Sequence, residues 1–181
     1  MDFILLLRGI NVGGNHSVKM AELKENLTNL ELHNVTSYIN SGNLFFSSLE
    51  SQDALQVMLE SYFKNNYSFD IPFLLISQTD YQKEFEALPE WWQEDYFRKN
   101  ALFFLPNTKN EDIDNFLEIA NFSQDELIHI GEFAIYWIIK KEGAYPQSFY
   151  HTKFIKTKLY KLVSIRNFKT AYYLAFKQKH K

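Results

Sequence analysis

The sequence predicts an α+β protein made of two small α+β subdomains, and three observations lead to that prediction. The chain has 181 residues, which suits one ordinary domain or two small ones. Apolar residues make up 46% of it and aromatic residues 17%, so there is ample material for a hydrophobic core. The first half follows the order strand–helix–strand–strand–helix–strand, the ferredoxin-like arrangement, and the second half follows a looser version of it.

The first, ferredoxin-like subdomain is predicted over residues 1–77. It opens with an apolar run of strand length in residues 3–10 (FILLLRGI). A helix is predicted over residues 20–32, because apolar residues recur there at helical spacing. Residues 34–48 predict two strands joined by a turn at Ser41, Gly42 and Asn43, with glycine where a positive φ is needed. A helix over residues 53–67 and a strand over residues 71–77 complete the subdomain.

The first strand is predicted to be covered on both faces of its sheet. Ile4 and Leu6 alternate with Phe3, Leu5 and Leu7, so neither face carries polar side chains. A sheet with one wet face would instead alternate apolar and polar residues. This pattern, and the lack of a basic–glycine–aromatic signature in the next strands, argue against an open sheet that reads RNA.

The second half is predicted to contain a connecting segment and a C-terminal subdomain. Residues 78–100 predict a helix broken near Pro89 and then a connection. Residues 101–181 form the C-terminal α+β subdomain with basic terminal helices. Its predicted elements are a strand at 101–106, a helix at 110–120, a hairpin at 126–140 that turns at Gly131 and Glu132, and helices at 153–163 and 166–176, the last with Asn167 as N-cap.

Charge is distributed unevenly along the chain. Residues 1–142 hold all 22 acidic residues and 10 Lys or Arg, a balance of −12. Residues 143–181 hold nine Lys or Arg and no acidic residue, a balance of +9. Such a basic segment packs against the acidic body of its own protein or meets an anionic partner, and the sequence leaves both readings open.

Several classes of function are disfavoured by composition. The chain has no cysteine, which rules out disulfides and thiol chemistry. The apolar run at residues 3–7 is too short for a signal peptide or a membrane span, so we expect a soluble, cytoplasmic protein that does not bind membranes. The five histidines, at positions 16, 33, 129, 151 and 180, show no metal-ligand spacing. We therefore expect no metal site, and no cofactor motif is present.

The loop after the first strand, RGINVGGNHS, resembles a phosphate-binding loop only in part. Its glycines do not give the G-x-G-x-x-G dinucleotide fingerprint. Gly9 and Gly14 have the spacing of a P-loop, but Asn15 and His16 stand where Lys and Ser or Thr are required. This substitution excludes nucleoside triphosphatase chemistry.

A more general anion site is predicted at the same place. Glycine-rich backbone followed by a helix start favours anions, because N–H groups converge there and the helix dipole adds partial positive charge. In a ferredoxin-like sheet the first and third strands are antiparallel neighbours, so the loops at residues 8–15 and 38–43 should meet at one edge. The predicted ligand-binding residues are Arg8, Asn11, Gly13, Gly14, Asn15, Lys19, Tyr38, Ser41, Gly42 and Asn43, with Arg166 and Asn167 as further members.

A structural reading of these residues stays open. Gly9, Gly13 and Gly14 would then only allow a tight connection, and Arg8 would form a structural ion pair. The asparagines would be turn residues whose side chains bond the local backbone.

Three motifs, LLRGINVGG, VKMAEL and YINSGNLFF, closely resemble the signature of the bacterial family called domain of unknown function 1697. The C-terminal SIRNFKT is similar to the family motif Thr-x-Arg-Asn-Trp-Asn-Thr, with Ser164, Phe168 and Lys169 as departures, and LPEWWQEDYFRKNALFFLP resembles its middle segment. The resemblance implies two α+β subdomains and carries no established activity. By matching position, the signature residues are Arg8, Gly9, Asn11, Gly13, Gly14, Tyr38, Ser41, Gly42, Asn43, Arg166, Asn167 and Thr170.

Three hypotheses of function follow. The first is a binding protein that holds a phosphate-bearing ligand, such as a nucleotide, or nucleic acid at the two loops. The second is an enzyme that acts on a small phosphorylated metabolite in the same place, where only His16 could serve as a base. The third is a protein-interaction module that uses the basic C-terminal helices.

Overall fold

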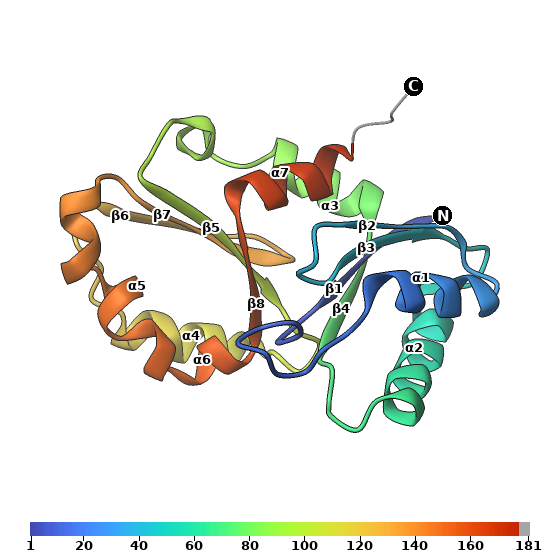
Figure 1. Cartoon of the computed structure of the whole chain (residues 1–181). Helices are drawn as coiled ribbons and strands as arrows, with labels where there is room; N and C mark the ends of the chain where they lie inside the picture. The colour runs from blue at the N-terminus through green and yellow to red at the C-terminus, as the bar shows by residue number, and fades with distance from the viewer. Residues whose placement is uncertain (178–181) are drawn as a thin grey trace. The chain divides into compact units, whose positions relative to one another are not determined.

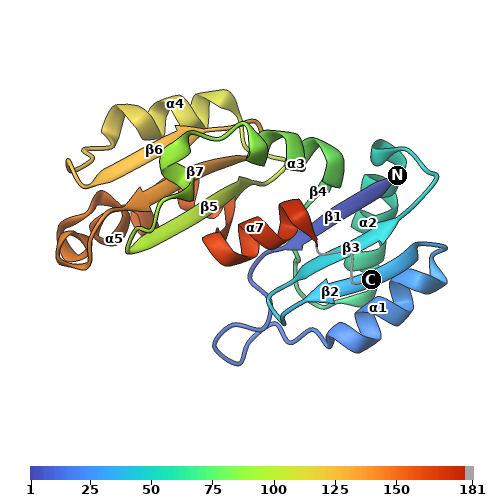
Figure 2. The same cartoon turned by 90° about the horizontal axis from the view of Figure 1, so that it is seen from above.

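A computed structural model describes residues 1–177, and these form two compact units that divide between Tyr81 and Gln82. Lys179, His180 and Lys181 of the basic C-terminal segment lie outside the described residues. Figures 1 and 2 show that each unit is a sheet with helices, so the chain is α+β with two α+β subdomains, as predicted.

The first unit has the predicted ferredoxin-like order of elements. They are β1 (Asp2–Leu7), α1 (Met20–Asn29), β2 (His33–Tyr38), β3 (Asn43–Ser47), α2 (Gln52–Asn66) and β4 (Phe73–Ser77). The strands lie in the order β2-β3-β1-β4, and every neighbouring pair is antiparallel. Both helices pack on one face of this sheet (Figure 1).

The core of the first unit lies between that sheet face and the two helices. Phe3, Leu5 and Leu7 of β1 belong to the same hydrophobic cluster as Leu23 of α1 and Leu59 of α2. The alternate residues of β1 are buried as well, and all of residues 3–7 are at most 1% exposed. The predicted burial of both faces of β1 is confirmed.

The second unit has the same strand order as the first. Its sheet runs β6-β7-β5-β8, formed by β5 (Arg98–Phe104), β6 (Glu126–Ile130), β7 (Ala134–Ile139) and β8 (Val163–Asn167), with antiparallel neighbours. The α-helices are α4 (Asn110–Ile119), α5 (Phe149–Thr152), α6 (Lys158–Lys161) and α7 (Phe168–Phe176). Three 3₁₀ turns, η1 (Glu90–Gln93), η2 (Glu142–Gln147) and η3 (Phe154–Lys156), complete it, and α3 (Gln78–Glu86) precedes η1.

One predicted element is wrong. A single helix was expected over residues 153–163, with Ile155 and Leu159 on one apolar side, but the segment forms η3, α6 and the start of β8. The side-chain oxygen of Thr157 accepts a hydrogen bond from the Tyr160 N–H and so starts a new short helix. Ile155 is 58% exposed, which shows that it does not share the buried side of Leu159.

β8 was missed because it has no strand signal of its own. It forms by pairing with β5, with Ala101 opposite Arg166 and Phe103 opposite Ser164, and it completes the edge of the sheet. β5 also starts at Arg98, earlier than the strand predicted from residue 101. The helix that follows β8 is confirmed, because the Asn167 side chain caps α7 by accepting from the Thr170 N–H at 2.9 Å.

Within residues 1–177, no helix is both long enough and apolar enough to cross a membrane.

Candidate functional site

The glycine loop (residues 8–18) and the 38–43 turn meet at one end of the first sheet. The Leu7 N–H donates to the Gly42 carbonyl at 2.8 Å, and Asn11 Nδ2 donates to the Asn40 carbonyl at 3.1 Å. Gly42 lies close to the end of β1 and to the glycine loop. A Cβ added to Gly42 would lie 2.8 Å from Leu7 Cβ and 3.1 Å from Ile10 Cδ1. The juxtaposition expected from the strand order is therefore present in the structure. We refer to the two segments together as the loop pair.

Asn11 holds the glycine loop in shape. Its Oδ1 accepts from the Val18 N–H at 2.8 Å, and its Nδ2 donates to the Val18 carbonyl at 3.0 Å as well as to Asn40. The Asn11 N–H donates to the His16 carbonyl at 3.1 Å. Asn11 also has a φ of 55°, a left-handed conformation that asparagine tolerates better than most residues. The Asn11 side-chain amide therefore forms hydrogen bonds with the local backbone, as the structural interpretation of the turn asparagines expects.

Asn43 has the same role in the 38–43 turn. It is fully buried, and its Nδ2 donates to the Tyr38 carbonyl at 3.1 Å and to Ser41 Oγ at 3.0 Å. A buried amide that left these bonds unmade would be costly, so Asn43 fixes the turn. Of the predicted ligand-binding residues, Asn11 and Asn43 therefore build the loop pair.

Gly42 is buried, Tyr38 is half-buried and Ser41 is exposed, whereas the other members in the first unit present backbone and positive charge at the surface. Gly13, Gly14, Asn15 and Lys19 are exposed, and Arg8 is half-buried, with its N–H donating to the Pro72 carbonyl at 2.8 Å. α1 begins directly after the loop, and Lys19 at its N-cap makes no capping hydrogen bond from its side chain within the described residues.

The start of α1 differs from most other helices in the chain. α2, α5, α6 and α7 each begin with a Ser, Thr or Asn side chain that accepts a backbone N–H. An ammonium group carries no acceptor, so Lys19 cannot do the same. The Lys19 side chain therefore leaves the first N–H groups of α1 without a capping acceptor, and the cations Arg8 and Lys19 flank the loop in sequence. Glu22 in the first turn opposes part of this positive charge.

His16 lies within the glycine loop on an aromatic ring from another part of the chain. Its ring stacks on Phe69 with centroids 4.4 Å apart and an interplanar angle of 13°. Its Nδ1 lies 3.3 Å from the Gly9 carbonyl, which can only accept, so Nδ1 is the donor in this contact. Phe69 was not predicted, because nothing in the sequence places the segment before β4 beside this loop.

Arg166 and Asn167 belong to the second unit and have structural partners there. Arg166 is 8% exposed, and its Nη1 donates to Ser164 Oγ and to the Ile165 carbonyl, both at 2.9 Å. Burial lowers the pKa of Arg166 to about 10. Asn167 is the cap of α7. Their proposed part in ligand binding stays a prediction.

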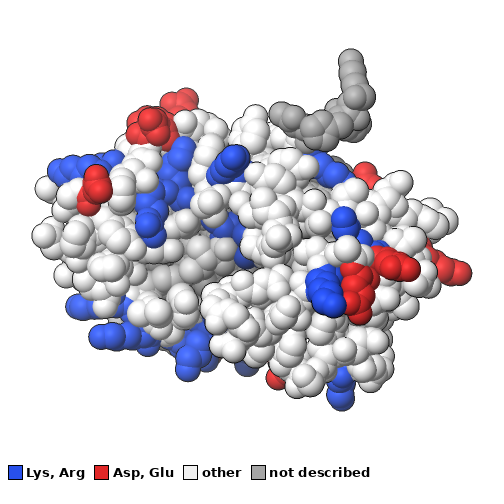
Figure 3. All heavy atoms as spheres, viewed as in Figure 1, with Lys and Arg blue, Asp and Glu red and all other residues white. Residues whose placement is uncertain are grey.

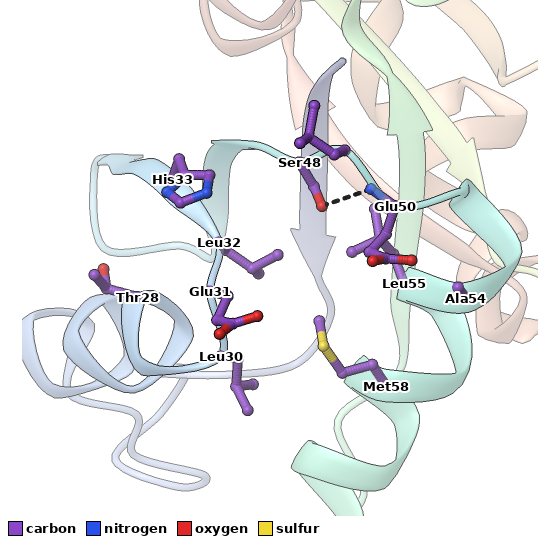
Figure 4. A pocket seen from close by; sticks show the side chains of 11 residues that line it. Thr28, Leu30, Glu31, Leu32, His33, Ser48, Glu50, Ala54, Leu55 and Met58 are labelled. Carbon is purple, nitrogen blue, oxygen red and sulfur yellow. Dashed lines mark hydrogen bonds between the residues drawn. The ribbon is translucent and has the colours of Figure 1, made fainter.

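A separate hollow of about 720 Å³ lies at the other end of the first sheet (Figure 4). There, Asp2 at the start of β1 pairs with Ser47, whereas the loop pair lies near the Leu6–Asn43 pairing. Figure 4 shows Leu32 and Met58 among its apolar lining, with Glu31 and Glu50 beside them. Sequence reasoning missed this hollow. The one weak signal was a leucine at position 49 between the polar residues Ser48 and Glu50, and the structure shows that this leucine is exposed.

Neither region has a metal-binding constellation. Among residues 1–177, no group of three or more His, Asp or Glu side chains is placed to hold a metal ion. Among the described residues, His16 contacts the Gly9 carbonyl and the Phe69 ring and shows no contact with a nucleophilic side chain. Its arrangement suits binding of an anion through backbone N–H groups and cations.

Comparison with known proteins agrees with this picture at the level of fold. The model of a protein family described as "Protein of unknown function (DUF1697)" matches residues 1–136. A solved structure, "The structure of conserved bacterial protein SP0830 from Streptococcus pneumoniae", is 40% identical, covers 96% of both chains and superimposes with a TM-score of 0.91. A search of curated proteins finds no match.

Proposed function

The chain belongs to the DUF1697 family of proteins of unknown function, and we propose from its own geometry that it binds a phosphate-bearing anion at the loop pair. The observation that carries the proposal is that the start of α1 has no side-chain cap from Lys19 and follows a glycine loop flanked in sequence by two cations, Arg8 and Lys19. A bound phosphate would accept hydrogen bonds from the free N–H groups and neutralise the two charges. A cytoplasmic location, which the absence of cysteine favours, is part of the same proposal.

A nucleotide fits this region better than free phosphate. The His16–Phe69 stack lies at the glycine loop, so an aromatic face is available next to the charged groups. Aromatic side chains stack readily on nucleobases. We therefore expect a nucleotide to bind more tightly than pyrophosphate, and pyrophosphate more tightly than phosphate.

A thermal-shift screen of phosphate, pyrophosphate, nucleotides and short oligonucleotides tests the proposal. A ligand present at 100 times its Kd stabilises the protein by about 2.7 kcal/mol, which raises Tm by about 5–10 °C for a chain of this size. Arg8→Ala should lose most of this shift. Lys64→Ala is the matched control, because Lys64 is an exposed cation in the last turn of α2. Equal shifts for wild type and Arg8→Ala would contradict the proposal.

An enzyme acting on a small phosphorylated metabolite is the second candidate, and His16 is the observation in its favour. The contact with the Gly9 carbonyl uses Nδ1, so Nε2 is the ring nitrogen that would serve as a general base. Turnover of a panel of phosphorylated metabolites by wild type and its abolition in His16→Asn would support this candidate. Binding that is unchanged in His16→Asn, with no turnover by wild type, would leave only the binding function.

A further inference from the structure

An exposed cluster of aromatic rings and cations lies in the second unit, at the start of β5 and along η2 and α5. The guanidinium carbon of Arg98 lies 4.2 Å from the centroid of the Tyr145 ring. The His151 and Phe97 rings lie 4.5 Å and 5.9 Å from the same centroid. We call these four residues, Phe97, Arg98, Tyr145 and His151, the Tyr145 cluster.

The members of the cluster differ in exposure, which distinguishes the residue that supports the other side chains from those that can contact a ligand. Tyr145 is half-buried and is the ring that Arg98 and His151 share. Phe97 is 43% exposed and His151 is exposed, so their rings can reach a ligand. The Arg98 guanidinium lies over the face of the Tyr145 ring, and this contact places its charge within the cluster.

Positive charge continues along the chain from this cluster. Lys153 and Lys156 follow His151 and are exposed, and residues 143–181 contain no acidic residue. Figure 3 shows Lys and Arg side chains gathered at the lower left, over the segment that carries α5 and α6 in Figure 1.

Two acidic groups near the segment are engaged in ion pairs. Asp125 pairs with Lys141 at 3.3 Å, and Asp112 pairs with Lys158. Exposed acidic residues near the cluster in sequence include Asp95, two residues before Phe97, and Glu142, at the start of η2.

We propose that the Tyr145 cluster, together with Lys153 and Lys156, binds single-stranded nucleic acid. Bases would stack on the exposed rings of Phe97 and His151, while Arg98 and the two lysines would contact phosphates. Such binding tolerates any sequence, because every base has an aromatic face.

Other polyanionic partners fit this surface less well. An acidic peptide would use the lysines but has no need of exposed aromatic rings. Double-stranded DNA is read by a helix or ribbon inserted in a groove, whereas α5 and α6 have four residues each. The surface is independent of the loop pair, which belongs to the first unit, so either proposal can fail without the other.

Fluorescence anisotropy with labelled oligo(dT) and oligo(U), about twelve nucleotides long, tests this proposal on the full chain. Phe97→Leu keeps the apolar bulk and removes the aromatic ring, so a merely structural role would survive it. We expect Phe97→Leu to weaken binding about 5- to 100-fold, the range for losing one stacked base, and Phe97→Trp to retain wild-type affinity. Equal affinities for Phe97→Leu and Phe97→Trp would overturn the stacking role.

The lysines are tested by the salt dependence of binding. The log of the association constant falls as the log of the salt concentration rises. The double variant Lys153→Gln/Lys156→Gln should make this slope less steep by about 1.4, which corresponds to two phosphate contacts on a single strand. Lys24→Gln/Lys64→Gln, in α1 and α2, makes the same change in net charge and should leave the slope unaltered. No binding by wild type at low salt, or equal slopes for the two double variants, would overturn the proposal. So would a poly-aspartate of equal charge that binds as tightly as oligo(dT), which would indicate an acidic protein as partner.

Discussion

Gly42→Ala should disrupt the contact between the two segments of the loop pair. Gly42 has a φ of +79°, and an added Cβ would lie 2.8 Å from Leu7 Cβ and 3.1 Å from Ile10 Cδ1. Ordinary contacts of a Cβ fall between 3.4 and 4 Å, so the backbone or both neighbours must move. Leu7 and Ile10 are buried at the end of β1, where there is little space for such a shift.

The expected loss has two parts. A left-handed conformation costs about 1–2 kcal/mol for a residue with a Cβ. Overpacking against the buried neighbours adds about 1–3 kcal/mol. We therefore expect Gly42→Ala to lower the free energy of unfolding by about 2–5 kcal/mol, a large part of the 5–15 kcal/mol typical of a protein.

Gly13→Ala is the matched control for this variant. Gly13 has a φ of +60°, but an added Cβ meets no atom within 4 Å among the described residues. It should therefore show only the conformational cost of about 1–2 kcal/mol. The difference between the two variants isolates the close approach of the loop pair.

Urea denaturation followed by far-UV circular dichroism is the appropriate assay. All three tryptophans, at positions 91, 92 and 137, lie in the second unit, so their fluorescence would report that unit and not the site of the change. Equal losses of stability in Gly42→Ala and Gly13→Ala would refute the reasoning, because the two segments would then not be in close contact.

Three further variants test other contacts. Asn11→Ala removes two hydrogen bonds within the glycine loop and one to the 38–43 turn, and should cost about 1–3 kcal/mol in urea denaturation, while unchanged stability would show that the Asn11 amide is dispensable. Glu126→Ala removes a buried carboxylate that accepts three backbone N–H groups and should cost the second unit about 2–4 kcal/mol, measured by tryptophan fluorescence, with Glu126→Gln the milder change. The hydrogen bond from Lys158 holds the pKa of Asp112 below its usual value of 3.8, so its contribution to stability is present above about pH 4 and is lost as pH falls through the lowered pKa. Lys158→Gln should therefore flatten the pH dependence of Tm below about pH 4, and a profile identical to wild type would contradict this assignment.

The first unit could be predicted from the sequence because each element carries its own local signal. The apolar run of β1, the helical spacing in α1 and the glycine turn before β3 are separate patterns that agree with one fold. The meeting of the glycine loop with the 38–43 turn then follows from strand order alone, since β1 and β3 are antiparallel neighbours.

The parts that could not be predicted depend on contacts distant in sequence. β8 follows Leu162 without glycine or proline to mark the change, and it becomes a strand because β5 offers an unpaired edge. The stacking of His16 on Phe69 brings together residues from before α1 and before β4, which no local pattern records. The structural use of the Asn11 and Asn43 amides was foreseen only as an alternative, because an asparagine in a turn looks the same whether it bonds backbone or ligand.

The two units also show that the candidate site belongs to the sequence of one loop and not to the fold. Both sheets have the same strand order, and β5 occupies in the second the place that β1 occupies in the first. The connection from β1 to α1 covers residues 8–19 and contains three glycines, whereas that from β5 to α4 covers residues 105–109 and contains none. There the Lys109 N–H already donates to Asp112 at 3.0 Å, so a carboxylate of the protein occupies the place that an external anion would take. If the ferredoxin-like fold alone produced an anion site, both helix starts would be open, whereas only the start of α1 follows a glycine loop and has no side-chain cap from its N-cap residue or first turn.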